Sequence, residues 1–481
     1  MKDEKNDDQE VIQPENLIGN VSEGIVQSEI EQTAWIEPVD DHEHIVDIES
    51  EESQAKIAES RAIFAEFLKD FGTKLDLEDK DSVAEVLKAA KTRGIYDGAT
   101  RIREYFYGRN VTIYGVSYLS NVCEEKCLFC PMGQSCLRDE RAKDKLRDPN
   151  ITPTEKTENE AVIATHESRL KTMTPEEAEQ DMAALAAMGH NEICVLAGSA
   201  LGLSYENLIP YVRIALSQPG IREVSLNLKQ FEAGELRAFL EELQDGFQIP
   251  EGVKLQFRIF QETYDPDVYD HLMQHSDLVH GKRNYSVRYN AQIVAGEVGK
   301  ALEATGLTGI TEIGIGALFG LRRFPIEEIA DLQQHAEVIK LLTGIEVKRC
   351  CLPFGNEPKD SHVEIPFMIP GRSDADEIIE LIYALARLAM PTVSIVSSER
   401  DGTKLLRRLD RYAPHTTWNV HPYPCGNIEA LEKLQGKNIE HDNKTPQADT
   451  QPRKIEVFRD WLNRDFFPRF DIKRLRRTIR K

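Results

Sequence analysis

The sequence has no run of eighteen apolar residues, and its first ten residues are mostly acidic and polar. A membrane-spanning helix needs about 20 apolar residues, and targeting segments begin with basic or apolar stretches. We therefore expect neither a membrane span nor a signal or transit peptide, and we expect a cytoplasmic protein. In that compartment its 8 cysteines do not indicate a disulfide framework, while 481 residues that are 41% hydrophobic can bury a large core.

Basic residues are fewer than acidic ones, 59 against 82, which gives a formal charge of -23. Up to Ala55 there are 17 acidic residues against two lysines, so we interpret residues 1–54 as an acidic, disordered leader. Binding to nucleic acid is disfavoured, because attraction to phosphate supplies most of that affinity. The opposite bias occurs in Arg453–Lys481, with 11 basic and four acidic residues. This segment either contacts an acidic partner or a nucleic acid, or forms the solvated face of a last helix.

Between these ends, short β-like runs alternate with helical patterns. Helices are predicted over Ala55–Phe71, Asp81–Arg93, Ala99–Tyr107 and Thr174–Met188, the last with a Thr-Pro-Glu-Glu capping box. Strands separated by helices pair in parallel, and eight of them suit a closed TIM-type (βα)8 barrel of the α/β class. The eight predicted strands are Val111–Ser117, Glu192–Ala197, Glu223–Leu228, Lys254–Phe260, Ile310–Leu318, Glu346–Pro353, Thr392–Ser398 and Thr416–Val420.

The same patterns predict how the chain is divided. After the leader come an N-terminal helical cap at 55–108 and the barrel at 109–430. A polar insertion at 137–168 interrupts the barrel repeat, and 431–481 forms a polar linker and a basic C-terminal helical extension.

Three cysteines, Cys123, Cys127 and Cys130, have the spacing C-x3-C-x2-C. Thiolates are ligands for iron-sulfur clusters and for zinc, and this spacing lets one loop hold three corners of a cubane. The fourth iron then has no protein ligand and can bind the amino and carboxylate groups of S-adenosylmethionine (SAM), whose reductive cleavage gives a 5'-deoxyadenosyl radical. The motif follows the first predicted strand, on the face where such barrels hold their sites. The alternatives are a structural zinc loop, with Cys136 as a fourth ligand, and three unrelated buried thiols.

Three further runs accompany this motif: Tyr118–Cys123, Phe260–Tyr264 and Gly314–Gly320. Together they resemble the radical SAM superfamily and, within it, the aromatic amino-acid lyases, namely the tyrosine lyases of thiamine thiazole synthesis and of hydrogenase maturation and the tryptophan lyase, together with biotin-synthase-like barrels. The resemblance runs from about residue 107 to residue 426. It implies a radical SAM barrel, a 4Fe-4S cluster and SAM as cofactors, and a reducing electron donor such as flavodoxin or ferredoxin.

The resemblance also implies roles for individual residues. Phe129 is similar to the family's adenine contact, and Gln261, Glu262 and Thr263 are similar to the positions that hold the ribose hydroxyls. Arg288 resembles the arginine that pairs with the SAM carboxylate, a contact that a guanidinium can make in bidentate form. The plainer alternatives are a satisfied polar strand end for residues 261–263 and a surface ion pair for Arg288.

The glycine run and two departures from the family's sequence also concern the carboxyl-end rim of the predicted barrel. Gly316 begins a turn that lets the backbone approach adenine, unless the run serves barrel packing alone. Where the family has Gly-Glu to hold the SAM amino group, the sequence has Gly198 and Ser199. The lyases carry Ser-Thr-Arg-Glu near the seventh strand, whereas Ser397-Ser-Glu-Arg400 has the last two reversed. Either Arg400 reaches the substrate carboxylate from a shifted loop, or the substrate is held differently.

Other cysteines carry less information. The sequence after Cys425 has no cysteine, so a second cluster of the hydrogenase-maturation type is not expected. His421, Tyr423 and Cys425 either contact substrate or belong to an ordinary loop, and we expect Cys350 and Cys351 to be buried, inert thiols.

We therefore predict hydrogen abstraction from an amino-acid-like small molecule, followed by cleavage of a carbon-carbon bond next to the α-carbon. One alternative is another radical SAM outcome, such as rearrangement or sulfur insertion as in biotin synthase. The other is a non-catalytic barrel that acts as a binding or scaffold protein, for which the Ser199 and Arg400 departures are the only support.

Overall fold

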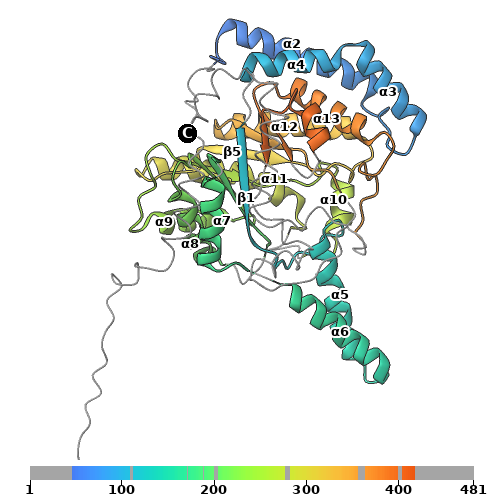
Figure 1. The fold of residues 1–481 in the computed structure, drawn as a ribbon, viewed down its shortest axis with the longest axis vertical. Coiled ribbons are helices and arrows are strands. Elements are labelled where there is room, and N and C mark those ends of the chain that lie inside the picture. Colours follow the sequence, from blue (N-terminus) through green and yellow to red (C-terminus); the bar gives the residue numbers. More distant parts are fainter. Residues whose placement is uncertain are drawn as a thin grey trace, which may run out of the picture.

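Eight parallel strands close into a barrel in which each strand pairs with the next and β8 pairs with β1 (Figure 1). The computed structural model describes residues 46–108, 112–170, 172–187, 189–199, 204–276, 282–355, 363–398 and 403–417. The predicted α/β barrel is confirmed, and every strand overlaps its predicted range. The strands are β1 (Thr112–Ser120), β2 (Glu192–Ala197), β3 (Glu223–Asn227), β4 (Lys254–Arg258), β5 (Glu312–Gly316), β6 (Val347–Cys351), β7 (Ser394–Ser398) and β8 (His415–Thr417).

Helices connect the strands and cover the outside of the barrel. The capping box predicted at Thr174 is present: its N–H donates to Glu177 Oε2 at 2.9 Å, and the Glu177 N–H donates to Thr174 Oγ1 at 3.2 Å. The helices that follow β1 to β7 are α7 (Pro175–Ala187), α8 (Tyr205–Leu216), α9 (Ala233–Gln244), α10 (Pro266–Met273), α11 (Tyr285–Glu303), α12 (Pro325–Thr343), α13 (Ala375–Ala389) and α14 (Thr403–Leu409).

The N-terminal helices cover a part of the barrel that would otherwise expose apolar surface. Helix α13 is buried along almost its whole length, and a helix that is apolar all round needs cover on its outer side. That cover comes from α2 (Glu51–Phe71) and α4 (Ile95–Tyr107), which pack on α13, with α3 (Lys80–Thr92) beside them. The predicted start at Ala55 lies four residues inside α2.

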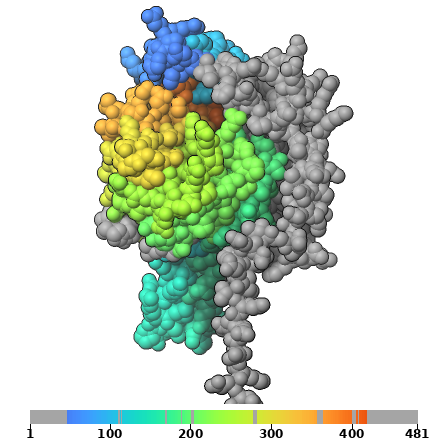
Figure 2. Space-filling model, turned by 90° about the vertical axis from the view of Figure 1, so that its left-hand side faces the viewer, coloured from blue at the N-terminus to red at the C-terminus, as the bar shows by residue number. Residues whose placement is uncertain are grey.

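The segment predicted as a polar insertion at 137–168 belongs to a helical hairpin. Helices α5 (Pro131–Leu146) and α6 (Pro153–Arg169) pack on each other and project from the barrel, away from α2–α4 (Figures 1 and 2). Helix α6 begins with a capping box in which Thr152 and Glu155 satisfy each other's N–H groups. Apart from this capping box, α6 carries little sequence signal of a helix, because none of the side chains at 153–167 is buried and no apolar stripe results.

The remaining predicted segments lie largely outside the described residues. These are the leader up to residue 45, the end of the barrel after Thr417 and the C-terminal extension at 431–481. Among the helices that are described, none is long and apolar enough to cross a membrane.

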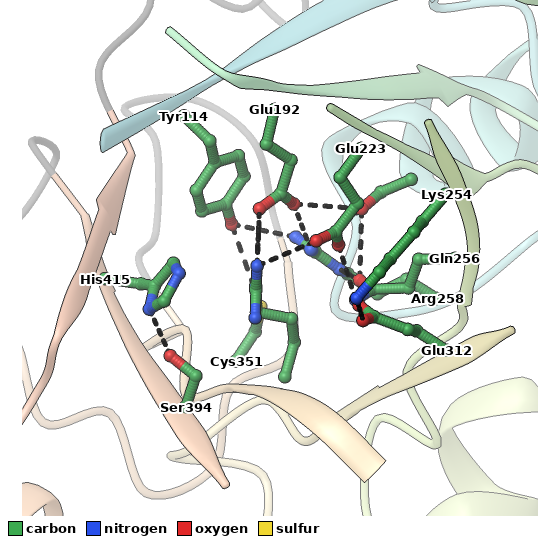
Figure 3. Close-up of polar contacts among 12 residues, drawn as sticks. Tyr114, Glu192, Glu223, Lys254, Gln256, Arg258, Glu312, Cys351, Ser394 and His415 are labelled. Carbon is green, nitrogen blue, oxygen red and sulfur yellow. Dashed lines mark hydrogen bonds and ion pairs between the residues drawn. The ribbon is translucent and has the colours of Figure 1, made fainter. Parts of the chain in front are cut away.

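The amino end of the barrel holds a buried network of charges (Figure 3). Arg258 extends from β4 across the lumen to Glu192 at the start of β2, and both side chains are 1% exposed. Arg349 on β6 bonds Glu192 at 3.1 Å and Glu223 at 2.9 Å. Further partners of Arg258 are Gln256 at 2.7 Å, Tyr114 Oη at 2.9 Å and Ser225 at 2.9 Å.

This polar interior departs from the branched apolar layers usual in such barrels. Burying a charge is costly unless it is paired and hydrogen-bonded, and each buried carboxylate here has a basic partner. Burial acts to raise the pKa of Glu192, but Arg349 and Arg258 hold it below its usual value. Burial raises the pKa of Glu223, which shares Arg349 with Glu192. Lys254 and Glu312 form the outer pair at 2.8 Å, where Lys254 is 57% exposed.

Candidate functional site

The cysteine loop connects the carboxyl end of β1 to α5. Cys130 is the residue before the first turn of α5, and Pro131 opens that helix. Backbone bonds fix the loop on three sides: Glu124 N–H donates to Ser199 O at 2.7 Å, Leu128 N–H donates to Leu272 O at 2.9 Å, and Leu128 O accepts from Glu364 N–H at 2.9 Å. The loop therefore lies where the carboxyl ends of several strands meet.

Two glycines allow this close packing. A Cβ at Gly198 would lie 2.3 Å from Val122 O, and a Cβ at Gly133 would lie 2.4 Å from Cys127 O. Any larger residue at either position would displace the loop.

The three predicted ligands lie together in this loop. Cys127 is buried, while Cys123 and Cys130 are partly exposed. Burial raises the pKa of all three thiols, that of Cys123 to about 12, and the Cys130 thiol adds to the rise at both Cys123 and Cys127. No group of three His, Cys, Asp or Glu side chains in the described part of the chain is placed to hold a single metal ion. Three thiolates can hold three corners of a cubane, whereas a structural zinc site takes four protein ligands.

Cys136, the alternative fourth ligand, has a different partner. Its thiol donates a hydrogen bond to Cys123 O at 2.8 Å. Burial raises the pKa of this thiol to about 11. Cys136 therefore stabilises the loop through a backbone contact.

A charged group, which the sequence did not predict as a whole, lies against the thiols. The Lys282 ammonium bonds Glu262 and lies 5.6 Å from the centre of the Phe129 ring. Arg288 lies 3.7 Å from the same carboxylate, and its Nε donates to Phe260 O at 2.8 Å. Two cations thus surround one carboxylate near the cysteine loop, and the cations suit an anionic ligand group.

Lys282 keeps its charge in this position. Burial acts to lower its pKa, but the Glu262 carboxylate and the Cys127 thiol hold it above its usual value. Glu262 has a φ of 73°, the only positive value of a non-glycine residue in the described part of the chain. Such backbone strain is found mostly at functional sites. No local sequence signal marks Lys282, which reaches the thiols only through the fold.

The other predicted cofactor residues differ in whether the described residues already supply their hydrogen-bond or packing partners. Gln261 is fully buried, and neither its side-chain oxygen nor its nitrogen has a partner among the described residues, which fits a polar ligand. Thr263 is already engaged, because its hydroxyl bonds Glu328 Oε2 at 3.3 Å. At Gly316 a Cβ would lie 2.7 Å from both Cys351 O and the Phe260 ring, so barrel packing by itself requires glycine there.

Ser199 lies against the cysteine loop, as its position after β2 predicts. Its hydroxyl donates to Glu125 Oε1 at 3.4 Å. Cys350 and Cys351 are buried as predicted. The predicted substrate contact Arg400 and the rim residues His421, Tyr423 and Cys425 lie outside the described residues.

Comparison with known proteins extends this picture at the level of the fold. No protein-family model and no curated protein matches the sequence. A crystal structure of HydG, a maturase of the FeFe-hydrogenase, matches with a TM-score of 0.52 at 18% identity over 78% of this chain and 73% of HydG. This chain shares the HydG fold. HydG from Carboxydothermus hydrogenoformans matches with a TM-score of 0.54 at 19% identity, covering 85% and 83% of the two chains. The fold implied by the resemblance to the lyases is therefore confirmed.

Proposed function

We propose that the protein is a radical SAM enzyme. The observation that carries the proposal is the set of three cysteines on the loop after β1, beside the cations Lys282 and Arg288, at the carboxyl end of a closed parallel barrel. Active sites of such barrels lie at this end. A 4Fe-4S cluster with SAM, when bound, supplies a 5'-deoxyadenosyl radical after reduction by a donor such as flavodoxin or ferredoxin.

The chain's own residues then have distinct tasks. Cys123, Cys127 and Cys130 hold the cluster at three corners. Arg288 and Lys282 attract the SAM carboxylate, and Arg288 is oriented by its bond to Phe260 O. Gln261, whose buried amide has no protein partner among the described residues, is the polar group for the ribose. Phe129 packs with Cys127 and offers an aromatic or backbone contact to adenine.

We further propose an amino-acid-like substrate and cleavage of a carbon-carbon bond next to its α-carbon. Beside the charged network the barrel interior has a small apolar cluster, and such a surface suits a hydrocarbon or aromatic group. The cluster comprises Tyr114, Cys194, Cys351 and Val396, with Val116 and Phe260 packed against them, and Tyr114 also bonds Arg258 of the network.

Anaerobic reconstitution tests the proposal. We expect one four-iron cluster per chain and release of 5'-deoxyadenosine when SAM and dithionite are added. A search for metabolites consumed by the reconstituted protein then separates bond cleavage from rearrangement or sulfur insertion by the products. A cluster that assembles without any SAM cleavage would instead indicate the scaffold alternative.

Arg288→Ala should weaken SAM binding by roughly 1.5 to 3 kcal/mol, the scale of a hydrogen bond to a charged group. Iron content should not change, because Arg288 is not a cluster ligand. Calorimetric titration of the reconstituted protein measures the affinity. The control is Arg283→Ala, in the same segment but 35% exposed, which should bind SAM normally. Equal affinities for wild type and Arg288→Ala would mean that the carboxylate is held elsewhere.

Tyrosine or tryptophan should stimulate SAM cleavage, and Arg400→Ala should remove the stimulation while sparing the slow uncoupled reaction. The reason is alignment: misplacing a reacting group by about 1 Å can cost roughly a hundredfold in rate. The measurement is 5'-deoxyadenosine formed with and without the amino acid, with Arg411→Ala, 49% exposed, as the control. If neither amino acid stimulates cleavage or is consumed, the aromatic-lyase assignment fails, whereas the radical SAM assignment does not depend on it.

A further inference from the structure

Glu125 is a buried acid within the cysteine motif itself. It lies between Cys123 and Cys127 and is 7% exposed, whereas its neighbour Glu124 is exposed. One of its carboxylate oxygens, Oε1, accepts a hydrogen bond from Lys282 N–H at 2.9 Å and a longer one from the Ser199 hydroxyl at 3.4 Å. The other oxygen, Oε2, is buried and has no hydrogen-bond donor among the described residues.

A buried carboxylate oxygen without a donor is costly, and the missing partner is expected to be a cation or an N–H group. Among the described residues, the Lys282 ammonium bonds Glu262 and not Glu125. Lys282 thus connects two acids: its backbone N–H holds Glu125, and its side chain holds Glu262. Around Glu262, the two cations Lys282 and Arg288 outnumber the one carboxylate. In the cysteine loop, Glu125 presents an unpaired carboxylate oxygen.

This polarity matches the amino-acid end of SAM, which carries a carboxylate and an amino group on one carbon. We propose that Glu125 Oε2 accepts a hydrogen bond from the α-amino group of SAM while Arg288 and Lys282 attract its carboxylate. The proposal rests on the radical SAM function proposed above and adds a residue to it. It also accounts for Ser199. The turn after β2 has this serine in place of a glutamate, and the Ser199 hydroxyl bonds the carboxylate of Glu125 in the cysteine loop.

The test compares Glu125→Gln with Glu124→Gln in the reconstituted protein. Both changes remove one negative charge from the same loop and keep the side-chain shape, but only Glu125 is buried against Ser199 and Lys282. Each protein is titrated with SAM and with its desamino analogue, in which hydrogen replaces the ammonium. Iron content and the cluster's electron paramagnetic resonance spectrum are recorded for each variant.

Glu125→Gln should bind SAM about 10- to 100-fold more weakly, the range of a hydrogen bond to a charged group. Its affinity for the desamino analogue should equal that of wild type, and Glu124→Gln should match wild type with both ligands. Iron content should be unchanged in both variants.

Three results would overturn the assignment of Glu125. Equal losses for SAM and the desamino analogue would mean that Glu125 only shapes the loop. Loss of iron in Glu125→Gln would mean that it holds the cluster. Wild-type protein that binds both ligands equally well would mean that no residue recognises the amino group, whatever the variants do. Failure of wild type to bind SAM at all would refute the radical SAM function itself and is distinguishable from these three.

Discussion

Replacing Cys127 with alanine should abolish both the iron-sulfur cluster and SAM cleavage. Cys127 is the most deeply buried of the three thiols, at 4% exposed, and it packs with Leu128 and Phe129 in one apolar cluster. Without Cys127 only two thiolates remain as ligands, and two thiolates hold a cubane poorly. We expect iron content and 5'-deoxyadenosine formation at background after anaerobic reconstitution.

The controls for this prediction are Cys136→Ala and Cys350→Ala. Cys136 donates to a backbone carbonyl of the same loop, and Cys350 is fully buried in β6, far along the chain from the motif. Both variants should retain a full cluster, although Cys136→Ala loses one hydrogen bond. Normal iron content and undiminished SAM cleavage in Cys127→Ala would rule out the proposed cluster. Loss of iron in Cys136→Ala alone would favour a site in which that thiol is a ligand.

The sequence predicts the barrel and the cysteine motif because both are local signals. Strand β2 is predicted with its observed bounds, since an apolar run there is flanked by a helix and a glycine. The thiols are close in the chain, so their proximity in space follows from the spacing alone. Gln261 and Arg288 are expected only through the resemblance, and their roles stay predictions.

What the sequence does not predict depends on contacts between distant segments. Lys282 reaches Glu262 and the thiols only because the segment before α11 returns over the cysteine loop. Glu125 resembles Glu124 in the sequence, and only the packing of Ser199 and Lys282 distinguishes the two. The charged network does have a local sequence signal, because polar residues alternate along β4, at Lys254, Gln256 and Arg258. In a buried strand this pattern indicates a polar lumen.

Arg258→Met should lower the free energy of unfolding by about 3 to 5 kcal/mol, the usual cost of breaking one side of a buried ion pair. Among the described residues, the variant leaves Glu192 with Arg349 as its only basic partner, and it removes donors from Gln256, Tyr114 and Ser225. Lys254→Met is the matched control, because it removes a cation of the same network whose side chain is 57% exposed. It should cost less than Arg258→Met, because only Glu312 of this pair is buried, at 8% exposed, and Lys254 itself lies largely in solvent. Urea unfolding followed by circular dichroism measures both.

The double variant Arg258→Met with Glu192→Met distinguishes two causes of destabilisation, namely the lost attraction between the two side chains and the buried charge left unpaired. Replacing both partners of a buried pair by apolar groups is often close to neutral, whereas removing one leaves the other charge unsatisfied. The double variant should therefore be more stable than Arg258→Met, although Arg349 then depends on Glu223 alone. If the double variant is the less stable of the two, Glu192 contributes through Arg349 and not through Arg258. If Arg258→Met and Lys254→Met lower the free energy of unfolding by the same amount, burial does not govern how much each charge contributes. The buried charges of the lumen would then not be a main source of the barrel's stability.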